Sequence, residues 1–118
     1  MKGKQKERLV RIKERSFIAR VAAWKLNSDN AAIVIGNTIH LYNATRPEFL
    51  KNKAWFCHEL KHIQQFRQYG FIPFVFLYVW ESLLHGYANN KFEIEARAAE
   101  NEEHMIENIR LLDQGQRG

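Results

Sequence analysis

The sequence predicts an α+β fold that is mainly helical, with about four helices and one short β element. Apolar residues recur at helical spacing along most of the chain. Only the segment from Ala32 to Tyr42 is rich in Ile, Val and Thr. With 118 residues, 46% of them hydrophobic, the chain has the length and composition of one folded domain, expected over residues 1–118.

Residues 1–26 are predicted to form a basic amphipathic helix. Val10, Phe17, Val21 and Trp24 recur at spacings of seven, four and three, and Lys and Arg fill the positions between them. Residues 1–25 contain nine Lys or Arg and two Glu, which gives this segment a net charge of +7. Because the net charge of the whole chain is +5, residues 26–118 carry −2. We expect a solvated helix face with at most weak contact to an anionic surface, and no nucleic-acid partner.

Residues 27–44 are predicted to form the β element. Asn27-Ser28-Asp29-Asn30 is a cluster of turn formers, and Gly36-Asn37 interrupts the β-branched run that follows it. The segment is therefore one strand, or two short strands folded at Gly36. Because an isolated hairpin is marginal in water, it must pack on the helices, and we expect it to leave an edge exposed.

Residues 45–70 are predicted to be helical and to carry the motif described below. Thr45 and Glu48, with Pro47 between them, form a capping-box pattern, and Gly70 supplies a stop. Lys51-Asn52-Lys53 interrupts the pattern, which allows a short turn before a longer helix from about Lys53 to Tyr69.

Two further helices complete the expected fold. Residues 71–87 hold a connecting helix from Pro73 to His85, whose apolar run is about half the roughly 20 residues that span a bilayer, so we expect it to be buried. Residues 88–113 hold a helix capped by Asn90. Its inward face comprises Ile94, Ala98, Met105, Ile109 and Leu112.

The cysteine content and the N-terminus limit the cellular setting. The single cysteine, Cys57, cannot form an internal disulfide or a cysteine-based zinc site, so a metal would have to be held by His and carboxylate side chains. The basic N-terminus lacks the continuous apolar segment of a signal peptide, and the chain lacks a membrane-spanning stretch. We expect a cytoplasmic protein.

The motif His58-Glu59-Leu60-Lys61-His62 indicates a zinc site. In a helix, residues i and i+4 project from one face, so His58 and His62 can place two nitrogens on one metal. Catalytic zinc takes three protein ligands and keeps one position open for water. Glu59 would act as general base toward that water.

The third ligand is expected from a second helix. Residues 91–99 lie about thirty residues beyond the motif, so one intervening helix can return them antiparallel to it. This geometry brings a carboxylate to the metal, but by itself it leaves Glu93 and Glu95 as alternatives.

Phe92-Glu93-x-x-Ala96 resembles the third-ligand helix of gluzincins, notably the integral-membrane prenyl-protein proteases and their bacterial heat-shock relatives. The resemblance implies that Glu93 is the ligand and that Ala96 lets two helices approach. Arg97 stands where those proteins have Asp, the usual carboxylate that orients a ligating histidine.

A wider resemblance runs from about Ser16 to Asn101. The matching segments are Ala32 to Leu41, Trp55 to Gln65 around the motif, Gly70, and Asn90 to Ala96. Together they resemble a family of small bacterial metallopeptidases that consist of little more than a minigluzincin core. The resemblance implies a zincin-like minimal core. It also implies an oxyanion donor, for which the candidates are Tyr87, His85 and Tyr78, and a substrate edge strand comprising Ile35, Gly36, Asn37, Thr38, Ile39, His40 and Leu41.

These patterns lead to two functional hypotheses. The first is a zinc metalloendopeptidase of gluzincin type, with Zn²⁺ held by His58, His62 and Glu93, a zinc-bound water activated by Glu59, and a peptide or protein as substrate. The alternative is a zinc-stabilised protein-interaction module with little or no turnover, because a 14.0 kDa chain leaves little room for a lid or specificity lobe.

Overall fold

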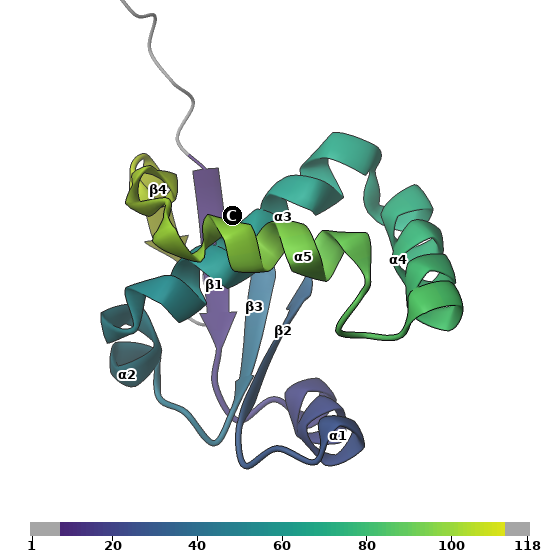
Figure 1. The fold of residues 1–118 in the computed structure, drawn as a ribbon. Helices are drawn as coiled ribbons and strands as arrows, with labels where there is room; N and C mark the ends of the chain where they lie inside the picture. Colours follow the sequence, from purple (N-terminus) through teal and green to yellow (C-terminus); the bar gives the residue numbers. More distant parts are fainter. Residues whose placement is uncertain (1–7, 113–118) are drawn as a thin grey trace, which may run out of the picture.

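The computed structural model describes residues 8–112. Its sheet has four strands in the order β2-β3-β1-β4, in which β1 runs parallel to β3 and β4 while β2 and β3 form an antiparallel hairpin (Figure 1). The strands are β1 (Arg8–Lys13), β2 (Ala31–Ile35), β3 (Thr38–Tyr42) and β4 (Ile109–Leu112).

Helices account for most of the remaining described residues. They are α1 (Phe17–Leu26), α2 (Arg46–Lys51), α3 (Lys53–Tyr69), α4 (Phe71–His85) and α5 (Lys91–Ala98), followed by two 3-10 turns, Ala99–Asn101 and Glu103–Ile106. The predicted α+β, mainly helical fold class is confirmed. In Figure 1, α3 and α5 cross each other over the sheet, whereas α4 projects from the body of the molecule.

A continuous hydrophobic core joins the sheet to α3. Val10, Ile12, Ile39 and Leu41 of the two central strands are at most 1% exposed and pack with Leu60 and its neighbours on α3. Aromatic rings fill the helix crossings: Phe74 of α4 meets Phe92 of α5 edge to face, with ring centroids 4.9 Å apart. The core therefore fixes α3 between the sheet and α5.

The prediction of one helix over residues 1–26 is wrong. Arg8–Lys13 is a strand, α1 begins only at Phe17, and residues 1–7 lie outside the described residues. Val10 and Ile12 alternate with Arg11, so a strand buries both apolar side chains in the sheet. Ser16 then caps α1, with its Oγ accepting a hydrogen bond from the Ala19 N–H.

The prediction of a helix over residues 88–113 is wrong beyond Ala98. After α5 the chain makes the two 3-10 turns, and Asn108 with a φ of 62° leads into β4. β4 pairs with β1 from Arg8 to Arg11, so Ile109 and Leu112 lie on a strand instead of a helix face. The β element at residues 27–44 is thus one part of a larger sheet, and residue 113 lies outside the described residues.

The predicted substrate edge is also wrong in most of its residues. Ile35 ends the outer strand β2, and Gly36 and Asn37 form the hairpin turn, where Gly36 has a φ of 65°. Thr38, Ile39, His40 and Leu41 belong to β3, which β2 and β1 flank on its two sides. The physical reason is that residues 8–13, expected to be helical, occupy the place beside β3.

The helix boundaries around the motif agree with the prediction. Thr45 and Glu48 form the capping box of α2, Asn52 separates α2 from α3, and α3 ends at Gly70. Gly86 ends α4, and Asn90 caps α5.

The connecting helix α4 is not buried as expected. Phe74 is its only fully buried hydrophobic residue, and Phe76 and Leu83 are 72% and 76% exposed. Within residues 8–112, no helix combines the length and the apolar composition needed to cross a bilayer.

Candidate metal centre

The motif lies in the middle of α3, where both histidines face the same way. The Asn52 side chain caps the helix by accepting a hydrogen bond from the Trp55 N–H, so the motif residues begin one turn inside a regular helix. The ring centroids of His58 and His62 are 5.2 Å apart. Leu60 and Ile63 point into the core, which turns the histidine pair toward α5.

Glu93 of α5 reaches both histidines. Its Oε1 lies 3.1 Å from His58 Nε2, and its Oε2 lies 3.1 Å from His62 Nε2. One ligand atom from each of these three residues can be chosen so that all lie within 4.8 Å of one another. Glu95, the alternative from chain spacing, instead accepts a hydrogen bond from the side chain of Gln65.

The three side chains are placed where they could hold a metal ion such as zinc. Tetrahedral zinc with bonds of about 2.0–2.1 Å has ligand atoms roughly 3.3 Å apart. Each histidine Nε2 has one Glu93 oxygen at 3.1 Å, Oε1 for His58 and Oε2 for His62. The donor set of two imidazoles and a carboxylate is one that catalytic zinc uses. Both histidines also present Nε2 to the shared centre, which leaves Nδ1 for a second partner.

Each histidine has such a partner on its Nδ1. Glu100, in the 3-10 turn after α5, accepts a hydrogen bond from His58 Nδ1 at 2.8 Å. Gln65 Oε1 accepts one from His62 Nδ1 at 2.9 Å, and Gln65 Nε2 donates to the Phe92 carbonyl oxygen at 3.1 Å. These bonds fix the ring orientations with Nε2 available for the metal.

Glu100 is the residue that sequence reasoning missed. Arg97, at the position where the resembling proteins have Asp, donates to the Ala88 carbonyl oxygen at 2.6 Å and contacts neither histidine. α5 ends at Ala98, and the 3-10 turn that follows it carries Glu100 to His58. Glu100 therefore supplies the carboxylate that Arg97 cannot, and only the turn after α5 brings it there.

Buried polar contacts continue into α4. The Tyr78 hydroxyl donates a hydrogen bond to Glu93 Oε2. Asn90, fully buried, caps α5 through its Oδ1 and donates from Nδ2 to the Tyr78 carbonyl oxygen at 3.0 Å and to Ser82 Oγ at 2.9 Å. The start of α5 is therefore held against α4, which sets the position of Glu93.

The charges of the cluster are strongly coupled. Burial alone would lower the pKa of His58, but its hydrogen bond to Glu93 and the nearby carboxylates prevail and raise it to about 9. The same balance raises the pKa of His62. Burial would raise the pKa of Glu93, yet its hydrogen bonds to the two histidines lower it well below the usual range. The cluster therefore favours a negative charge on Glu93 and a positive charge on the two imidazoles beside it.

Glu59 lies beside this cluster without joining it. Its side chain is buried, and the loss of hydration raises its pKa to about 7, against the opposing effect of the two histidines. A carboxylate with a pKa near neutrality can both accept and return a proton.

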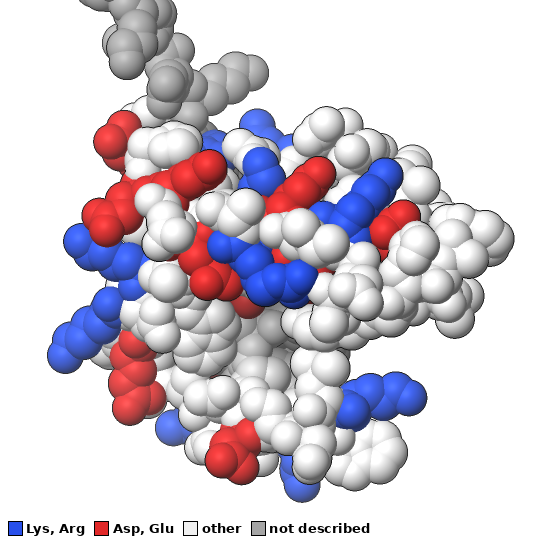
Figure 2. Space-filling view, in the orientation of Figure 1, with Lys and Arg blue, Asp and Glu red and all other residues white. Residues whose placement is uncertain are grey.

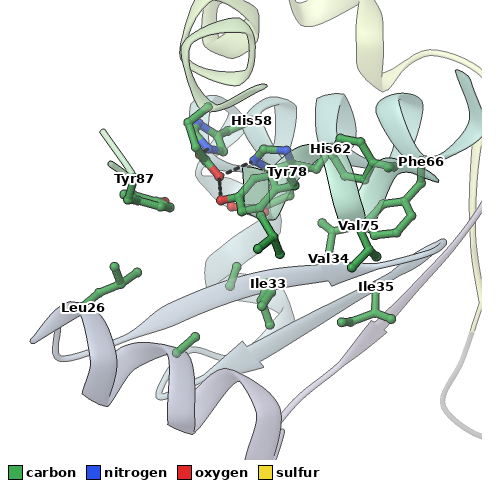
Figure 3. Close-up of a pocket in the computed structure, with 16 residues that line it drawn as sticks. Leu26, Ile33, Val34, Ile35, His58, His62, Phe66, Val75, Tyr78 and Tyr87 are labelled. Atoms are coloured by element: carbon green, nitrogen blue, oxygen red, sulfur yellow. Dashed lines mark hydrogen bonds and ion pairs between the residues drawn. The ribbon is translucent and has the colours of Figure 1, made fainter. Parts of the chain in front are cut away.

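The cluster opens into a cavity of about 190 Å³. Figure 3 shows His58, His62 and Tyr78 above the outer strand, with Ile33 and Ile35 of β2 and Val75 of α4 forming apolar walls. Each of the metal-binding candidates and Glu59 contributes to the lining. A substrate in this cavity would contact the cluster directly.

The three proposed oxyanion donors are placed differently. Tyr78 and Tyr87 line the cavity, and Tyr87 enters from the loop between α4 and α5 (Figure 3). Burial and the charge of Glu93 raise the pKa of both phenols, so both stay protonated as donors. His85, at the end of α4, is exposed and does not line the cavity, so the structure does not bring it to the site.

Comparison with known proteins gives no relative: no protein-family profile, curated protein or solved structure matches this chain. The resemblance to minigluzincins therefore stays a prediction, and the functional argument rests on the site itself.

Proposed function

We propose that this protein is a zinc-dependent metallopeptidase. The observation that carries the proposal is the convergence of His58, His62 and Glu93, with Glu59 beside them, on a cavity bordered by an edge strand. A mere pair of polar helix residues would not need a buried carboxylate shared by both rings, nor a separate partner on each Nδ1.

In this proposal the zinc ion, when bound, acts as a Lewis acid that polarises the substrate carbonyl and makes water more acidic. Glu59 accepts the proton of the attacking water and then donates it to the leaving amine, a role that its pKa of about 7 permits. Tyr87 and Tyr78 line the cavity as candidate hydrogen-bond donors to the oxygen that develops negative charge, and Tyr78 would have to exchange its hydrogen bond to Glu93 for one to that oxygen.

The substrate would be an extended peptide alongside β2. In the described part of the sheet β2 has β3 on one side only, so its other side can pair with a peptide backbone. Ile33 and Ile35 of β2, with Val75 opposite, favour apolar side chains at the cavity. This assigns substrate recognition to Ala31–Ile35 in place of the range expected from the sequence.

The decisive experiment compares wild type, His58→Ala and Glu59→Gln after preparation with zinc. Wild type and Glu59→Gln should each bind one zinc ion per chain, and His58→Ala should bind much less. Wild type alone should cleave members of a peptide library read by mass spectrometry. Wild-type protein that binds no zinc contradicts the proposal, as does Glu59→Gln protein that cleaves as fast as wild type.

The zinc-stabilised interaction module is the second candidate. The contacts around Glu93 tie α3, α4 and α5 together, so a metal there would also brace the fold. A chelator that strongly lowers the melting temperature, together with an uncut peptide library, would favour this candidate.

A further inference from the structure

Two helices beside the cavity expose large apolar side chains to solvent. From Phe71 to Leu84 the exposed side chains of α4 are all apolar, and the most exposed are Ile72, Phe76, Trp80, Leu83 and Leu84. In Figure 2 the outermost right-hand part of the molecule, where Figure 1 places α4, is white, and basic and acidic side chains appear only at its inner border. Soluble monomers rarely expose so many large apolar residues on one element, which marks an interaction surface.

α1 repeats this pattern with charges added at its borders. Ala19 and Ala23 are buried against the sheet, while Phe17, Val21 and Trp24 lie one helical turn apart on the opposite face. Phe17 is 72% and Trp24 77% exposed. Since each residue advances about 100° around a helix, Arg20 and Lys25 border this stripe on its two sides.

A hollow beside the start of α1 is lined in part by Arg15, Arg20 and Phe17. Its two arginines add positive charge at this end of the stripe. Within residues 8–112 the side chains of these two arginines form no ion pair, and α1 itself contains no acidic residue. An apolar stripe flanked by cations matches the chemistry of a helix that lies in the headgroup region of an anionic membrane.

In Figure 1 α4 lies at the right of the molecule and α1 at the bottom, and both border the cavity, through Val79 and Leu26 respectively. From these features we infer that the exposed faces of α1 and α4 form one docking surface for an anionic lipid bilayer, with the cavity opening beside the membrane. Tryptophan and phenylalanine enter the interface, and Arg15, Arg20 and Lys25 contact lipid phosphates.

A second copy of the chain fits this surface less well. A symmetric contact through α1 would bring the cations of both copies together, and the helix offers no carboxylate to neutralise them. Anionic headgroups supply that opposite charge. The inference needs neither bound zinc nor turnover, so its failure would leave the proposed function untouched.

The first test measures sedimentation with vesicles of phosphatidylcholine mixed equally with phosphatidylglycerol, and with vesicles of phosphatidylcholine alone, at low and high salt. Wild type should bind the mixed vesicles more strongly and lose binding as salt rises. Arg20→Gln/Lys25→Gln should bind them more weakly by about fivefold for each cation removed. Lys51→Gln/Lys53→Gln, with the same charge change at the distant junction of α2 and α3, should bind nearly as well as wild type.

The second test locates the contact with tryptophan fluorescence and brominated phosphatidylcholine in the mixed vesicles. Trp55 is partly buried against Phe49, whereas Trp24 and Trp80 lie on the docking surface. Trp55→Phe should therefore be quenched as strongly as wild type on binding, and Trp24→Phe/Trp80→Phe should lose most of the quenching.

Three outcomes would overturn the inference. The first is absence of binding to the mixed vesicles at low salt. The second is equal quenching in Trp55→Phe and Trp24→Phe/Trp80→Phe. The third is a dimer in solution that Phe76→Ser dissociates, with no vesicle binding, which would make this surface an interface between copies.

Discussion

The two faces of α4 differ in how far their side chains are satisfied by the rest of the molecule. On the inner face, Tyr78 donates to Glu93, and Phe74 is 3% exposed among aromatic rings. On the outer face, Phe76 and Trp80 are largely exposed to solvent. One helix thus separates a hydrogen-bonded polar centre from an apolar surface that is exposed within residues 8–112, and mutations on the inner face should cost much more stability than mutations on the outer face.

The largest expected effect is on metal binding. Glu93→Ala removes the carboxylate shared by both histidines, so two imidazoles remain, and zinc affinity should fall by more than a hundredfold. Glu95→Ala is the matched control, because Glu95 contacts Gln65 rather than the histidines. Calorimetric titration with zinc measures both. Equal loss in the two variants would contradict the assignment of Glu93.

A pair of substitutions on α4 tests the comparison in terms of stability. Phe74→Ala empties a packed aromatic site and should cost about 3–5 kcal/mol of unfolding free energy. Phe76→Ala should change it by about 0.5 kcal/mol or less, since its ring is 72% exposed. Urea denaturation monitored by circular dichroism distinguishes them. Similar losses in the two variants would mean that the outer face is covered.

The role of Glu100 gives a smaller effect. Glu100→Gln keeps the length of the side chain but weakens the hydrogen bond that orients His58, and zinc affinity should fall about 10–100-fold. Arg97 stands at the position where the gluzincins have the orienting Asp, but its side chain bonds to the Ala88 carbonyl oxygen. Arg97→Gln should therefore leave the zinc affinity nearly unchanged. Competition with a chromogenic chelator measures both. A larger loss of zinc affinity in Arg97→Gln than in Glu100→Gln would contradict the role of Glu100 as the carboxylate that orients His58.

The smallest expected effect concerns His40, away from the metal centre. Burial and the charge of Lys13 lower its pKa, and its Nδ1 is 2.9 Å from Ser16 Oγ. Because the folded state binds the proton less readily, the contribution of His40 to stability is complete above its unfolded pKa of about 6.5 and decreases as pH falls through the lowered folded value.

Unfolding of wild type and His40→Asn in urea at several values of pH checks this expectation. The stability difference between the two proteins should shrink from pH 8 toward pH 5. A difference that grows as the pH falls would show that the folded protein favours the charged imidazole.

The sequence predicted best where local chemistry acts alone. The capping box at Thr45, the stop at Gly70 and the cap at Asn90 each satisfy backbone groups within a few residues, so their patterns can be read directly. Arg8–Lys13 was misassigned because Val10 lies on both a helical and an alternating pattern, and only pairing with β3 and β4 decides between them. Residues 109–112 were misassigned for the same reason.

By itself, the sequence determined the fold class, the helix that carries His58, Glu59 and His62, and the position of a carboxylate about thirty residues later. Helical periodicity and capping depend on residues close together in the chain, so the sequence alone can predict them. The tertiary structure alone decided that within residues 8–112 β2, and not β3, is an edge strand, that Glu100 bonds to His58, and that the outer face of α4 is exposed. These three depend on contacts between segments distant in the chain, which strand pairing and helix packing set.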